Sequence, residues 1–199
     1  FINKEINLND INVVYKSEPS HLNSAFVIRQ AAIHPKTIDL KNSIISLKDI
    51  SLERSDIAIE VNSKAIDEKP KDTASAVADT SSMKIMADNI NLKNINLKYD
   101  DQAATKASSG MDFSHLAIED FSTKVTGLKY STDTILASVK STSFKEKSGF
   151  VLNNFTTDFY MIPTGVFLYN LLIQTPGTEL KNRAYVTYPS LEAIKKDKS

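Results

Sequence analysis

The sequence predicts an all-β fold with little helix, in the form of a curved, mostly antiparallel, repeat-built sheet. Apolar and polar residues alternate in short stretches, which is the pattern of strands with one buried face. The alternation recurs six times with the same interruption. Further stretches rich in β-branched or aromatic residues, bounded by polar turns, predict strands at 25–28, 57–61, 122–128, 134–139 and 183–187.

In each of the six copies, two alternating apolar residues are followed by two polar or semi-polar residues, and then the alternation resumes. The second intervening residue is always Asp or Asn: Asp10, Asp49, Asn94, Asp120, Asn154 and Asn170. The apolar positions are Ile6, Leu8, Ile11, Val13 and Tyr15; Ile45, Leu47, Ile50 and Leu52; Ile90, Leu92, Ile95, Leu97 and Tyr99; Leu116, Ile118 and Phe121; Phe150, Leu152 and Phe155; and Val166, Leu168, Leu171 and Ile173.

The interruption has a structural consequence. Two intervening residues shift the alternation by one position, which in a straight strand would move the following apolar side chains to the other face. We therefore expect a bulge or bend there, and Asp and Asn suit it because they tolerate left-handed backbone conformations. Repeated bends predict a curved sheet with a continuous concave apolar face. An ordinary sandwich whose strands carry bulges would give the same pattern.

The stretch 6–15 closely parallels 90–99, which indicates a larger duplicated module. Residues 65–82 contain few large apolar side chains and so predict a mobile linker. We thus expect a first β-repeat module at 1–64, the linker at 65–82 and a second β-repeat module at 83–199. Pro189 and Ser190 favour a short helix at 190–196.

Composition argues against several classes of function. The 24 basic and 24 acidic residues balance, which disfavours a nucleic-acid partner. With no cysteine, disulfides and thiolate metal sites are excluded. The sequence contains no run of 18 apolar residues, so it predicts no membrane-spanning helix. The first residue is Phe1, which suggests a fragment of a longer protein.

The residues that usually carry catalysis or bind metals are scattered. His21, His34 and His115 are far apart without metal-ligand spacing, and isolated surface histidines are the simpler interpretation. No phosphate-binding loop, nucleophile motif or acid–base pair of carboxylates is present. We therefore expect no enzyme activity and no cofactor.

The sequence resembles the AsmA/TamB group of Gram-negative envelope proteins, particularly the TamB-like translocation and assembly modules of Bacteroidetes. The resemblance covers most of residues 80–190 and is fainter in 1–65. It is carried by the stretches 90–99, 111–121, 147–155 and 168–178, in which the interrupted alternation recurs.

The resemblance implies a U-shaped, taco-like β-groove in a long periplasmic protein that is anchored in the inner membrane. Its role would be phospholipid transport between the inner and outer membranes, assembly of outer-membrane β-barrel proteins, or both; a structural or surface β-sandwich is the alternative. The partners would be phospholipid or acyl chains and, for the assembly role, outer-membrane β-barrel proteins. The candidate groove-lining residues are Ile6, Leu8, Ile11, Val13, Ile45, Leu47, Ile50, Leu52, Ile90, Leu92, Ile95, Leu97, Leu116, Ile118, Phe121, Phe150, Leu152 and Phe155.

Overall fold

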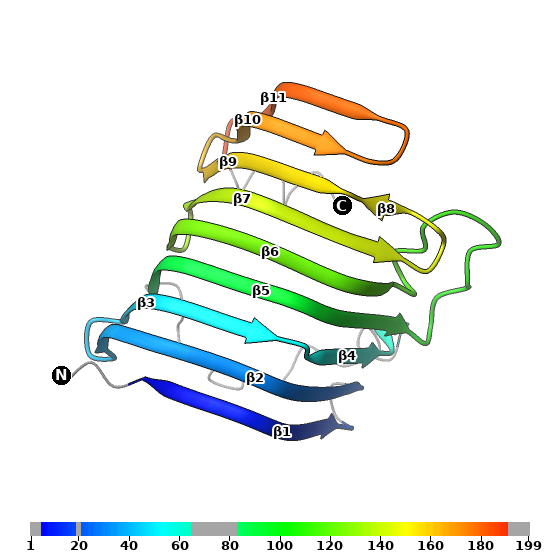
Figure 1. Cartoon of the computed structure of the whole chain (residues 1–199), viewed down its shortest axis with the longest axis horizontal. Coiled ribbons are helices and arrows are strands. Elements are labelled where there is room, and N and C mark those ends of the chain that lie inside the picture. The colour runs from blue at the N-terminus through cyan, green and yellow to red at the C-terminus, as the bar shows by residue number, and fades with distance from the viewer. Residues whose placement is uncertain (1–4, 19–20, 65–82, 191–199) are drawn as a thin grey trace.

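The computed structural model describes residues 5–18, 21–64 and 83–190, and it is built from strands (Figure 1). Strands account for 72% of it, and every element that lies wholly within these ranges is a strand, so the predicted all-β class is confirmed. The predicted linker at 65–82 lies outside the described residues, as does almost all of the predicted helix at 190–196. The strands are β1 (Ile6–Ser17), β2 (Leu22–Asp39), β3 (Ile44–Glu53), β4 (Asp56–Val61), β5 (Lys84–Asp101), β6 (Ala117–Tyr130), β7 (Ile135–Glu146), β8 (Val151–Leu152), β9 (Asn154–Ile162), β10 (Gly165–Gln174) and β11 (Glu179–Thr187).

All eleven strands belong to one sheet. Nine of them follow the order β1-β2-β3-β5-β6-β7-β9-β10-β11, while β4 pairs with β2 and β5, and β8 pairs with β7. The pairs are antiparallel except that β3 and β4 both run parallel to β5. β4 continues the line of β3 and pairs with β2 on its other side. The sheet therefore passes without a gap from residues before the predicted linker to residues after it, while the division into two modules stays a prediction.

The sheet has a line of backbone breaks where the sequence predicts them. Asp10, Asn94, Asp120 and Asn170 all have positive φ, between 51° and 55°. Such a conformation is uncommon for any residue with a side chain, and Asp and Asn tolerate it best. Four of the six predicted interruptions are therefore genuine changes of backbone direction.

The other two interruptions are resolved differently. Neither Asp49 nor Asn154 has a positive φ. Opposite Asp49, the pairing of β2 with β3 shifts register around Pro35. In the fifth copy the strand itself is divided, because β8 ends at Leu152 and β9 begins at Asn154. The expected bulge or bend is therefore present at these two positions as well, but as a register shift and a divided strand rather than as a left-handed residue.

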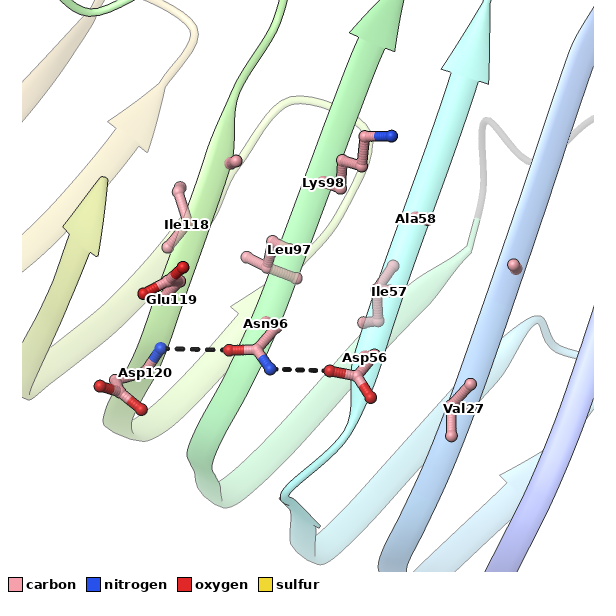
Figure 2. A pocket seen from close by; sticks show the side chains of 12 residues that line it. Val27, Asp56, Ile57, Ala58, Asn96, Leu97, Lys98, Ile118, Glu119 and Asp120 are labelled. Atoms are coloured by element: carbon pink, nitrogen blue, oxygen red, sulfur yellow. Dashed lines mark hydrogen bonds between the residues drawn. The ribbon is translucent and has the colours of Figure 1, made fainter. Parts of the chain in front are cut away.

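Arg54 is a break that the sequence did not reveal. Its φ is 50°, and it lies between β3 and β4. Glu53 pairs with Lys93 and Asp56 with Asn96, so Arg54 lies directly beside Asn94. Breaks in neighbouring strands are thus aligned, and Figure 2 shows these strands turning together just past Asp56, Asn96 and Asp120.

Buried Ser55 ties the aligned breaks to one another. Its side chain is 1% exposed; its Oγ accepts a hydrogen bond from the Arg29 backbone N–H at 3.2 Å and donates to the Glu53 carbonyl at 2.9 Å. The Ser55 carbonyl also accepts from the Asn96 backbone N–H at 2.9 Å. A bend disrupts the regular ladder, and these bonds satisfy main-chain groups that would otherwise be buried without a partner.

Candidate binding surface

Cross-strand pairing brings the predicted apolar residues into rows. Residues that pair directly across a ladder point to the same face of the sheet. One row crosses six strands, and another lies beyond the line of breaks. The first row is Ile6, Ile33, Ile50, Ile90, Val125 and Val139; the second is Val13, Phe26, Ile57, Leu97 and Ile118. The two rows lie on either side of the line of breaks. We call the two surfaces that carry them the apolar face.

The opposite face has a different chemical character. The row next to the first apolar row, pointing the other way, contains mainly polar side chains. It is Asn7, Ala32, Ser51, Asn91, Lys124 and Ser141. We call this the polar face. Segregation of this kind is expected when one face avoids water and the other meets it.

The candidate groove-lining residues differ in how far they are covered. Ile95, beside the break at Asn94, is the most deeply buried at 1% exposure, and Leu152 is also buried. Ile6, Val13 and Phe150 are exposed. The remaining candidates, which form the largest group, are half-buried. Most of the apolar face is therefore partly open, and whether it binds a lipid stays a prediction.

Two candidates lie somewhat apart from the main rows. Leu116 precedes β6 and is not part of a strand. Phe150 precedes β8, and its ring lies 5.9 Å from that of Phe144, which is 6.4 Å from Phe121. These three rings form an aromatic cluster where β6, β7 and β8 meet.

A cavity of about 570 Å³ lies over β2, β4, β5 and β6 (Figure 2). Ladder pairing places most of its lining residues on the polar face, where Ala25, Ala58 and Ala117 leave space. Asn96 bridges its rim: Nδ2 donates to Asp56 Oδ1 at 2.7 Å, and Oδ1 accepts from the Asp120 backbone N–H at 3.4 Å. With carboxylates on the rim, this cavity is a poor match to an acyl chain.

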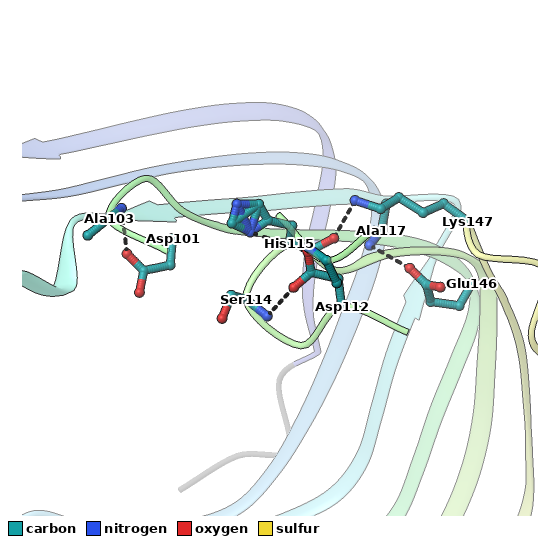
Figure 3. A network of polar contacts seen from close by, with 9 residues as sticks. Asp101, Ala103, Asp112, Ser114, His115, Ala117, Glu146 and Lys147 are labelled. Atoms are coloured by element: carbon teal, nitrogen blue, oxygen red, sulfur yellow. Dashed lines mark hydrogen bonds and ion pairs between the residues drawn. The ribbon is translucent and has the colours of Figure 1, made fainter. Parts of the chain in front are cut away.

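The structure corrects the prediction that all three histidines are isolated at the surface, because His115 is only 4% exposed (Figure 3). Its Nδ1 lies 3.8 Å from Asp112 Oδ2, and its carbonyl accepts a hydrogen bond from Lys147 Nζ. Hydrogen bonds from the Ala107 N–H and the Ser114 N–H lower the pKa of Asp112, and the electrostatic effect of nearby His115 and Lys147 lowers it further.

This network holds the segment between β5 and β6 against the end of the sheet. Asp101 accepts hydrogen bonds from the backbone N–H groups of Ser63 and Ala103, and Glu146 accepts from those of Ala117 and Ser148. In the described ranges no three potential metal ligands from His, Asp, Glu or Cys gather at one point. The arrangement is that of a structural clasp. The absence of enzyme activity stays a prediction.

Comparison with protein-family models, with curated proteins and with solved structures finds no match to this chain. Among the described residues, no helix is long and apolar enough to cross a membrane.

Proposed function

We propose that this chain is a non-enzymatic, lipid-handling segment of an AsmA/TamB-like envelope protein, in which the apolar face lines a trough for acyl chains. In such a protein the trough would conduct phospholipid between the inner and outer membranes of the periplasm. The observation that carries the proposal is the apolar row of Ile and Val that crosses six strands of a single sheet.

The partial exposure of this face supports the proposal. A closed core buries its Ile, Leu and Val side chains almost completely, whereas here few of the candidate residues are fully buried. A broad uncovered apolar surface is costly in water unless a ligand or partner occupies it. Acyl chains match it because they need contact with apolar side chains and no hydrogen bonds.

The aligned breaks supply a reason for a trough. Asp10, Arg54, Asn94 and Asp120 change the backbone direction at neighbouring places in the sheet. A bend shared by adjacent strands folds the whole sheet along one line, whereas scattered bulges would only distort single strands. A sheet folded with its apolar face inward gives the U-shaped section that the resemblance implies.

A second candidate function is assembly of outer-membrane β-barrel proteins. β1 and β11 end the strand order and pair on one side only within the described ranges. Such edges offer free main-chain donors and acceptors to an incoming strand. Crosslinkers placed along β1 and β11 would capture barrel precursors if this function holds, and lipid alone if it does not.

Native mass spectrometry after mild purification with phospholipid tests the lipid-handling proposal. We expect bound phospholipid on the parent chain and its loss from Leu92→Asp and Leu97→Asp, with the strand signal in circular dichroism preserved. The matched control is Asn91→Asp, which places the same charge next to Leu92 but on the polar face. Unfolding of the Leu92 and Leu97 variants would instead favour the structural β-domain, and a parent chain free of lipid would refute the proposal.

A further inference from the structure

An aromatic cluster lies on the polar face at the β11 end of the sheet. Phe167 pairs with Tyr160 on β9 and with Tyr185 on β11, so the three side chains share a face. Tyr169 follows two residues later on β10. The Phe167 ring lies 6.1 Å from that of Tyr169 and 6.2 Å from that of Tyr185, at interplanar angles of 7° and 16°. We call these four residues the aromatic platform.

The platform belongs to the face opposite the proposed trough. Lys129 on β6 pairs with Leu136, which pairs with Tyr160, and this continues the row across the sheet. Val139 of the first apolar row lies three residues from Leu136 on β7, in unshifted pairing with β9, so Leu136 and Tyr160 point away from the apolar face. The platform therefore takes no part in the proposed trough.

The platform is open to solvent. Tyr160, Tyr169 and Tyr185 are all exposed, Tyr185 at 61%. Their hydroxyl groups make no hydrogen bond within the described ranges, so their polar ends are free to meet water or a ligand. The Phe167 ring packs directly over Gly165: a methyl group at Gly165 would lie only 2.9 Å from it.

Positive charge predominates around the platform. Arg183 shares a face with Tyr185 and lies across from the bulge after Tyr169. Neither Arg183 nor Lys129 forms an ion pair with a described residue. Lys140 lies close enough to Asp158 to contribute to lowering the pKa of that carboxyl. Asp158 is the opposing charge, and it is already bound by Ser138 and Asn170. Arg183, Lys129 and Lys140 therefore bring three positive charges to the region of the platform.

We propose that the aromatic platform docks the protein on the interfacial region of a bilayer that contains anionic phospholipid. Tyrosine suits that region because its ring enters the acyl boundary while its hydroxyl stays among the headgroups. Arg183 and the two lysines supply the attraction to anionic headgroups. A client strand would use the edge of β11, whereas this platform occupies the flat face next to that edge.

Vesicle co-sedimentation tests the proposal, with vesicles of phosphatidylcholine alone and of phosphatidylcholine with one third phosphatidylglycerol. We expect the parent to bind both kinds of vesicle, and the anionic kind more tightly. The double variant Tyr169→Ser/Tyr185→Ser should bind each kind about tenfold more weakly than the parent does. Arg183→Gln should lose about fivefold on the anionic vesicles and nothing on the neutral ones. Phe113→Ser is the matched control, because Phe113 is 73% exposed but lies outside the platform.

The outcomes separate this proposal from the proposed function. Leu92→Asp alters only the apolar face, so it reports on lipid uptake by native mass spectrometry and not on docking. Should the double variant misfold, Tyr185→Ser alone, on the exposed last strand, carries the test. Vesicle binding unchanged by the platform variants would overturn the proposal. The proposal would also be overturned if the parent does not bind vesicles but self-associates through the platform, as measured by light scattering.

Discussion

The left-handed break at Asn94 allows a direct test of the bend line, because its φ of 52° reverses the usual preference of a strand. Asn94→Gly relieves the backbone and Asn94→Val strains it, and both lose the same weak 3.5 Å contact from Ser122 Oγ. The two variants therefore differ in backbone conformation more than in contacts. A left-handed residue with a Cβ costs about 1–2 kcal/mol, so Val should be less stable than Gly by about that amount.

The matched position is Asn91, three residues earlier on β5 and in regular pairing with Ser51 and Lys124. There Val should exceed Gly in stability by up to about 1 kcal/mol, since extended strands favour β-branched residues. The order of Gly and Val is thus opposite at the two positions.

Urea unfolding measures both comparisons, followed by far-ultraviolet circular dichroism and by tyrosine fluorescence, which the 7 tyrosines provide in the absence of tryptophan. With a urea slope of about 2 kcal/mol per molar, Asn94→Val should unfold at a midpoint roughly 0.5–1 M below Asn94→Gly. If Val equals or exceeds Gly at position 94, the left-handed break is not present in solution, and the reasoning about the bend fails.

Three further predictions concern hydrogen bonds of the sheet. Ser55→Ala should lower the free energy of unfolding by about 1–3 kcal/mol in urea titration, because it leaves the partly buried Arg29 backbone N–H without its partner. Thr157→Val removes the 3.0 Å bond from Thr157 Oγ1 to the β10 backbone at nearly constant volume, and thermal unfolding should show a loss of about 1 kcal/mol. The hydrogen bond from Ser138, a second from Asn170 and the nearby Lys140 lower the pKa of Asp158. The stability that ionised Asp158 contributes is therefore complete above its unfolded-state pKa and is lost as pH falls through its folded-state pKa. Acid titration of stability should therefore show a smaller decline in Asp158→Asn than in the parent, and an identical decline would contradict this role.

The local pattern predicted much of the fold because strand alternation is a property of consecutive residues. The six interrupted copies lie on or next to strands, and the breaks at Asp10, Asn94, Asp120 and Asn170 follow from the tolerance of Asp and Asn for positive φ. The additional strands predicted between the copies are also present, within β2, β4, β6, β7 and β11.

The sequence missed features that depend on neighbours distant in the chain. Arg54 has no local signal for positive φ, and its conformation is explained by its place beside Asn94 and by the bonds of Ser55. The change of alternation between Leu52 and Ile57 was the only available clue. His115 was expected at the surface because no local pattern reveals that it is buried beside Asp112 and bonded by Lys147.

By itself, the sequence determined that the chain forms strands, which side chains alternate along them, and where most of the breaks fall, because these depend on the conformational preferences of adjacent residues. Only the tertiary structure decided which strands are neighbours, including the parallel pairing of β3 and β4 with β5. That pairing aligns the breaks and collects Ile50, Ile90 and Val125 into one row. The antiparallel pairing of β9, β10 and β11 gathers the aromatic platform in the same way. Register between distant segments is set by the summed burial and hydrogen bonding of whole strands, which no short stretch of sequence encodes.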